Sequence, residues 1–71
     1  MTELDNRGLM PPEPMMRILT AITEAQPGST VAVLMDREPF LLYPELERRG
    51  CTWTFEADEW HFRLTINVPS P

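Results

Sequence analysis

A helix framed by prolines is the feature that most constrains how this chain folds. Apolar side chains recur at helical spacing between residues 15 and 25, and such a stripe must be buried against a second layer: Met15, Ile18, Leu19, Ile22 and Ala25. Prolines are tolerated in the first turn of a helix, whose N–H groups have no intrahelical partner, so Pro12 and Pro14 mark its beginning. Pro27 and Gly28 mark its end.

Strand patterns lie on both sides of this helix. Residues 29–35 are apolar on both faces, which is typical of a central strand. Residues 3–6 are a weaker strand candidate, and Gly8 can adopt the positive φ that a tight turn into the helix requires. A strand, a helix and a second strand form a right-handed βαβ unit with parallel strands.

A second, shorter helix is expected after the central strand. Asp36 is a candidate N-cap for it, with Glu38 and Pro39 in the first turn. Pro44 would remove a hydrogen bond inside such a helix at a cost of roughly 3 kcal/mol, so we expect a kink or a restart with Pro44 near the first turn. Gly50, which follows two arginines, matches the end of a short helix.

The C-terminal third has the alternation of a β-hairpin. Apolar and polar side chains alternate over residues 51–56 and again over residues 60–67. A two-residue turn at Asp58-Glu59 keeps the apolar side chains on one face and predicts three cross-strand pairs: Phe55 with Phe62, Trp53 with Leu64, and Glu56 with His61. Residues 68–71 are expected to fray.

These elements follow the order β-α-β-α-β-β, which predicts an α+β fold. Two helices cover one face of a four-stranded mixed sheet and form a two-layer sandwich. The 71 residues are enough for one domain, residues 1–71. A single cysteine excludes an internal disulfide.

Charge and hydropathy limit the partners. The net charge is −5 and the six basic residues, all arginines, lie among acidic ones, so we expect no nucleic-acid partner. The N-terminus lacks the apolar run of a secretion signal, and residues 31–35 are too few to span a bilayer, so we expect a cytoplasmic protein with no membrane partner. No Cys/His cluster has metal-ligand spacing, and we expect no metal or other cofactor.

The residues before the first helix resemble the signature of a known family. Leu4-Asp5, Gly8-Leu9 and the run Met10-Pro11-Pro12-Glu13-Pro14 are similar to the start of the TusA-like (SirA-like) sulfur carriers, where Leu-Asp and Gly-Leu precede Cys-Pro-x-Pro. The resemblance implies the βαβαββ sandwich with sheet order 1-2-4-3. It also implies that Pro11 stands where the family carries its cysteine.

That replacement removes the family's chemistry from this turn. A persulfide carrier needs a thiolate, and proline offers no nucleophile. The chain is similar to an uncharacterised branch in which Pro-Pro-Glu-Pro replaces the motif, often with Asp-x-x-Pro at the second helix, as in residues 36–39. We therefore expect no catalytic residue and a binding domain rather than an enzyme.

Cys51 and His61 remain as candidates for chemistry. Alternation places Cys51 on the core side, where a free cysteine behaves as a small hydrophobe; the alternative is a reactive thiol that transfers sulfur in place of the missing one. His61 is expected to pair with Glu56 across the hairpin, and the alternative is a metal or redox role with nearby carboxylates.

The candidate binding surface lies at the start of the first helix. Arg7 and Arg37 each follow a strand and precede a helix, so both are expected at the sheet edge where α/β proteins bind ligands, here a small anion. Prolines remove N–H donors from this turn, and nearby acids can pair with the arginines instead. The apolar residues beside it favour docking of a protein partner or a second copy. The predicted site comprises Arg7, Met10, Pro11, Pro12, Glu13, Pro14 and Arg37.

Overall fold

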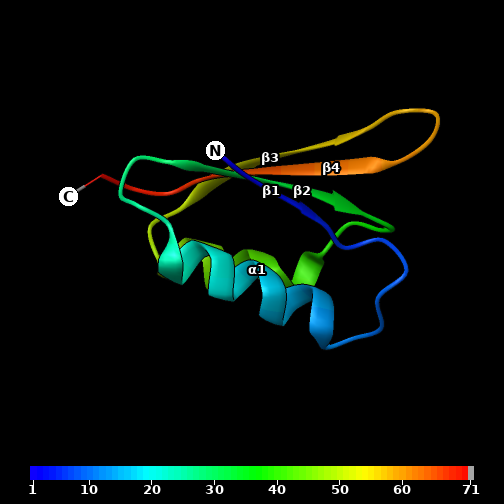
Figure 1. Cartoon of the computed structure of the whole chain (residues 1–71), viewed down its shortest axis with the longest axis horizontal. Coiled ribbons are helices and arrows are strands. Elements are labelled where there is room, and N and C mark those ends of the chain that lie inside the picture. Colours follow the sequence, from blue (N-terminus) through cyan, green and yellow to red (C-terminus); the bar gives the residue numbers. More distant parts are fainter. Residues whose placement is uncertain (71) are drawn as a thin grey trace.

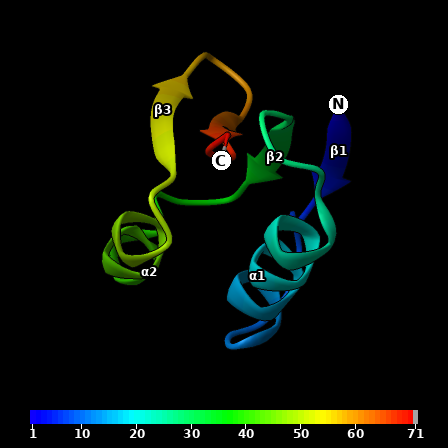
Figure 2. The same cartoon turned by 90° about the vertical axis from the view of Figure 1, so that its left-hand side faces the viewer.

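The computed structural model describes residues 1–70 as two helices on one face of a four-stranded sheet (Figure 1). The sheet order is β1-β2-β4-β3, as the family resemblance implies. Along the chain the elements are β1 (Thr2–Asp5), α1 (Glu13–Glu24), β2 (Thr30–Met35), a 3₁₀ helix η1 (Phe40–Leu42), α2 (Tyr43–Arg48), β3 (Thr52–Ala57) and β4 (Phe62–Asn67). Figure 2 shows α1 and α2 side by side beneath the sheet, while the other face stays open.

The core lies between the helices and the two central strands. β2 pairs with β1 in parallel and with β4 in antiparallel orientation, so Val31 lies beside Ile66 and Val33 beside Leu64. All four of these side chains are buried, and Ile18 and Ile22 of α1 pack on them with Leu42 and Leu46. The apolar stripe predicted for the first helix is therefore the stripe that faces the sheet.

The start of the second helix differs from the prediction. Asp36 does not cap it, because its Oδ2 accepts a hydrogen bond of 2.6 Å from the backbone N–H of Gly8 instead. The chain forms the short η1 first, and α2 then begins at Tyr43 with Pro44 in its first turn, which is the expected restart. At its end Gly50 has φ 75° and the N–H of Cys51 donates to the Leu46 carbonyl at 2.9 Å, as in a Schellman motif.

The hairpin exists, but the predicted two-residue turn is wrong. β3 and β4 are joined by residues 58–61, and Phe55 lies opposite Leu64 rather than Phe62. This register still keeps the apolar side chains on one face, because it differs from the predicted one by two residues. The Asp58 carboxylate favours the observed register over the predicted one, because its Oδ1 accepts hydrogen bonds from the backbone N–H groups of Trp60 and His61, at 2.8 and 2.9 Å. Trp60 consequently lies outside the core.

The segment after β4 forms backbone hydrogen bonds with the residues that precede β2. Val68, which we expected to fray, donates its N–H to the Ser29 carbonyl at 2.9 Å, and Gly28 donates to the carbonyls of Val68 and Pro69. Fraying of this end stays a prediction, and Pro71 lies outside the described residues. Neither helix in residues 1–70 is long and apolar enough to cross a membrane.

Candidate functional site

Two loops meet at the edge of the sheet where β1 and β2 end. One loop leads from β1 to α1, the other from β2 to η1, and they are joined by the Gly8 N–H that donates to Asp36. Asn6 holds the first loop in place through two hydrogen bonds. Its backbone N–H donates to the Leu34 carbonyl at 2.9 Å, and its Nδ2 donates to the Pro14 carbonyl at 2.9 Å. The beginning of α1 is thus attached to the sheet by a buried side chain.

Arg7 is not free at this edge. Its Nε and Nη2 donate to the two carboxylate oxygens of Asp5 at 2.8 and 2.7 Å, a bidentate pair with about half of each side chain exposed. The Arg7 guanidinium holds the pKa of the Asp5 carboxyl far below its usual range through these hydrogen bonds. Arg37 is exposed and forms no ion pair within residues 1–70. The guanidinium groups of Arg7 and Arg37 therefore do not form one shared anion-binding site, because Arg7 is already paired with Asp5.

The proline turn offers few donors to an anion. α1 begins at Glu13 with Pro12 in the N-cap position and no side-chain cap. The N–H groups of Glu13 and Met16 donate to the carbonyls of Met10 and Pro12, at 3.0 and 3.1 Å. With Pro14 lacking an N–H, the first turn has little left for a ligand.

An apolar groove lies between the two loops, and we call it the edge groove. It measures about 410 Å³ and is lined by the proline turn, by the start of α1 and by residues 35–42. Of the predicted site residues, the groove brings together Pro11, Pro12, Pro14 and Arg37, but neither Arg7 nor Met10 lines it. Phe40 and Leu41 line it as well and are 67 % and 82 % exposed.

Tyr43 holds residues 36–42, which line one side of the edge groove. Tyr43 stacks on Trp53 with ring centroids 4.9 Å apart, and its hydroxyl donates to Glu38 Oε2 at 2.8 Å. Burial, together with the Glu38 carboxylate, raises the pKa of Tyr43 to about 12. Glu38 lines the groove, so the hydrogen bond ties residues 36–42 to α2 and β3.

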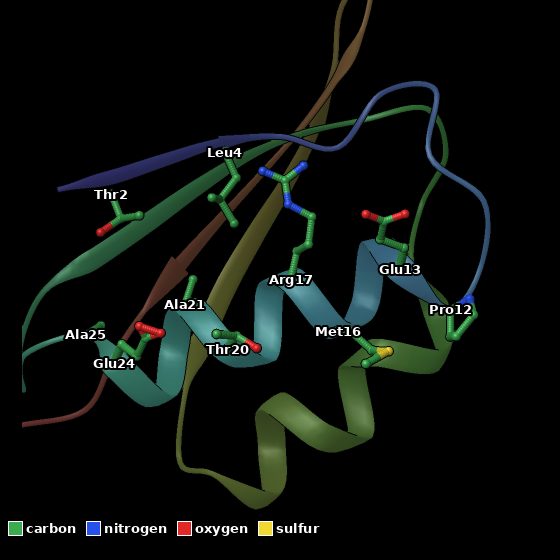
Figure 3. Close-up of a pocket in the computed structure, with 10 residues that line it drawn as sticks. All are labelled: Thr2, Leu4, Pro12, Glu13, Met16, Arg17, Thr20, Ala21, Glu24 and Ala25. Atoms are coloured by element: carbon green, nitrogen blue, oxygen red, sulfur yellow. The ribbon is translucent and has the colours of Figure 1, made fainter.

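A second groove lies between β1 and α1 (Figure 3). It measures about 640 Å³, and Glu13, the remaining predicted site residue near the turn, belongs to it together with Met16 and Arg17. Arg17 reaches across the groove, and its Nη1 donates to the Asp5 carbonyl at 3.1 Å. The sequence did not predict this groove, because it depends on how far α1 lies from the free edge of β1.

Cys51 and His61 lie away from both grooves. Cys51 is 4 % exposed and packs in the core, and burial raises the pKa of its thiol although the charge of Arg49 opposes this. The predicted pair of His61 with Glu56 does not form, because His61 Nε2 lies 3.4 Å from Asp58 Oδ2 instead. Within residues 1–70 no three His, Cys, Asp or Glu side chains gather as metal ligands would.

The fold is that of a TusA-like (SirA-like) domain. A SirA-like protein from Desulfitobacterium hafniense has a similar crystal structure, with a TM-score of 0.82 and 27 % sequence identity over 99 % of this chain and 100 % of that one. Residues 3–68 match the family described as Uncharacterized conserved protein (DUF2249), and the chain belongs to this family. No curated protein matches the chain.

Proposed function

We propose that this domain is a non-catalytic accessory module that docks a protein partner at the edge groove. The observation that supports the proposal is a concentration of exposed apolar side chains around one apolar groove on an acidic domain. Met10, Phe40 and Leu41 are each more than 65 % exposed beside a groove lined largely by proline, leucine and methionine. Methionine and aromatic side chains are enriched at protein interfaces, and exposed apolar clusters of this kind mark docking sites.

Substitution of the exposed apolar residues tests the proposal. Leu41→Asp places a carboxylate at the groove, and Met10→Asp places one beside it. Gln26→Asp is the matched control, because Gln26 is exposed and follows the opposite end of α1. A partner captured by the wild type and then purified should bind both groove variants about tenfold or more weakly, since a carboxylate is costly to bury, and the control unchanged. Equal affinity for all four proteins would contradict the proposal.

A small anion is a second candidate ligand at the same edge. Arg37 supports it, since this exposed guanidinium lines the groove without an ion-pair partner among residues 1–70. Phosphate or sulfate added to the wild type should then shift the NMR signals of residues 36–38, and Arg37→Ala should abolish the shifts. Shifts that persist in Arg37→Ala, or none in the wild type, would leave only the protein partner.

Sulfur transfer through Cys51 is the alternative function, and no observation favours it. The thiol is buried in the core and its pKa is raised, whereas a sulfur carrier needs an accessible thiolate. Free thiols persist in a reducing compartment, so the unpaired Cys51 is consistent with the cytoplasmic location that the proposal includes.

A further inference from the structure

β1 is an edge strand, and no strand of residues 1–70 covers its outer side. The sheet order places it at one end of the sheet, beside β2 alone (Figure 2). The backbone N–H of Asn6, which follows β1, donates to the Leu34 carbonyl of β2 at 2.9 Å. Neighbouring residues of a strand direct their backbone groups to opposite sides. The N–H and C=O groups of Glu3 and Asp5 therefore point away from β2, toward the free edge.

These outward backbone groups are a template for a further strand. Of them, the Asp5 carbonyl already accepts a hydrogen bond, from Arg17 Nη1 at 3.1 Å. A carbonyl oxygen has two lone pairs, so it accepts a second N–H beside Arg17. An exposed edge of this kind pairs with an extended peptide through main-chain hydrogen bonds, as in other cases of strand addition.

The groove between β1 and α1 gives an added strand room for its side chains. It measures about 640 Å³, and the Thr2 and Leu4 side chains point into it from β1 (Figure 3). On the side of α1 it is lined by alanines and by Met16, which is 61 % exposed. Side chains of a strand alternate between its two faces, so every second one enters the groove. Apolar side chains fit this lining.

The charges along this edge favour a basic strand. Glu3, Glu13 and Glu24 are exposed and form no ion pair within residues 1–70, whereas Arg17 is the one base that lines the groove. Side chains of the added strand that do not enter the groove lie on the same face as Glu3. Lysine or arginine matches that face, and a second copy of this chain would bring its own Glu3 there instead.

We propose that β1 accepts an extended segment of a partner protein as an additional strand of the sheet. Apolar side chains of the segment occupy the groove between β1 and α1, and lysine or arginine alternates with them on the face of Glu3. The site is separate from the edge groove, since Pro12 is the one residue that lines both. The proposal therefore does not depend on the function proposed above.

A short peptide tests strand addition. The probe is a capped peptide of about seven residues in which lysine and valine alternate, which is long enough to span β1. Added to isotope-labelled protein, it should shift the NMR signals of the Glu3 and Asp5 amides and slow their hydrogen exchange, with a dissociation constant between about 10 μM and 1 mM. No effect on these amides at about 1 mM peptide would overturn the proposal. Equal affinity for a peptide with glutamate in place of lysine would overturn it as well.

N-methylated peptides distinguish strand pairing from charge attraction. Methyl groups on the amides of all lysines block one edge of the peptide, and methyl groups on those of all valines block the other. One of the two peptides should bind about tenfold or more weakly than the parent, and the other should bind within about twofold of it. Equal affinities for the two methylated peptides would overturn the proposal whether or not the protein variants below fold.

Variants of Glu3 locate the contact on the protein. Glu3→Pro removes an outward N–H at an edge position where a strand tolerates proline, and it should weaken the lysine-valine peptide about tenfold. Glu3→Gln removes the charge alone and should weaken it about two- to fivefold. Glu47→Gln is the matched control, because Glu47 is exposed on α2, and it should have no effect. A Glu3→Pro variant with native circular dichroism that binds as tightly as Glu3→Gln would overturn the proposal.

The edge groove supplies a second control for the peptide. Leu41 lines the edge groove and does not line the groove beside β1, so Leu41→Asp should leave the affinity for the peptide unchanged. A tenfold loss in this variant would place the peptide in the edge groove and overturn strand addition at β1.

Discussion

Cys51 is the only thiol of the chain, and its reactivity measures whether sulfur chemistry is available in the native state. The side chain is 4 % exposed and follows the Schellman turn that ends α2, where its N–H is bonded to the Leu46 carbonyl. A thiol reagent therefore reaches the sulfur only after α2 and β3 separate. We expect the native protein to react far more slowly than the unfolded chain.

The magnitude follows from accessibility and ionisation together. A domain of 71 residues has a stability of roughly 4–10 kcal/mol at the usual value per residue, so reaction through global unfolding is slowed about 10³-fold or more. Local opening near Gly50 reduces this protection, and we expect at least about 100-fold. Burial also raises the pKa of the thiol above its ordinary value, which lowers the reactive thiolate fraction near neutral pH.

Reaction with a chromogenic disulfide at pH 8, in a series of urea concentrations, measures this protection. The rate should increase steeply with urea until it reaches that of the unfolded chain. A native rate within about tenfold of the unfolded one, and independent of urea, would refute the reasoning and revive the sulfur-transfer alternative. Cys51→Ala is the blank for the reagent.

Three further predictions concern stability and local structure. Leu46→Ala should cost about 2–5 kcal/mol in a urea melt, because this fully buried side chain leaves a cavity, while Leu41→Ala at an exposed position should stay within about 0.5 kcal/mol; equal effects would contradict the described core. Hydrogen bonds from the side chain and the backbone of Arg7 lower the pKa of Asp5, so its ionised form stabilises the fold above pH ~4 and this contribution is lost as the pH falls further. The stability difference between wild type and Asp5→Asn should shrink below pH ~4, and it should be smaller on an Arg7→Gln background, where only the backbone N–H and the charge of Arg17 still act on the carboxylate. Asp58→Ala should speed hydrogen exchange of the Trp60 backbone amide, because Asp58 Oδ1 accepts its hydrogen bond. Exchange protection of this amide equal to that in the wild type would contradict the described turn.

Apolar periodicity was enough to predict the elements and the two layers, whereas the sheet order came from the family resemblance. The stripe that includes Ile18 and Ile22 faces the sheet, and the doubly apolar β2 lies at its centre, because burial is required whatever the details of the loops. Periodicity does not fix the hairpin register, since a shift of two residues keeps every side chain on its face. The register depends on the Asp58 carboxylate, which accepts two N–H groups in the loop.

The site was predictable only as a region. Strand ends and proline positions predicted that the two loops lie at one edge of the sheet, but they gave no sign that Asp5 would pair with Arg7 or that Asp36 would accept the N–H of Gly8, 28 residues away in the chain. Asp36 has the sequence context of an N-cap, and a tertiary contact took precedence over that local preference. Asn6 carried no sequence signal at all, although it is the buried residue that attaches α1 to the sheet.

These contacts favour the proposed docking of a protein over the capture of an anion by the proline turn itself. Prolines remove N–H groups from the beginning of α1, and Asp36 accepts the N–H of Gly8, so few of the donors that a helix N-terminus normally offers an anion remain. What the turn presents is rigid apolar surface, which proline supplies at little further loss of chain entropy on binding. An exposed surface of this kind invites non-specific association, and the net charge of −5 counteracts it through repulsion between copies. Under the proposed function, selectivity therefore comes from a partner whose shape fills the groove.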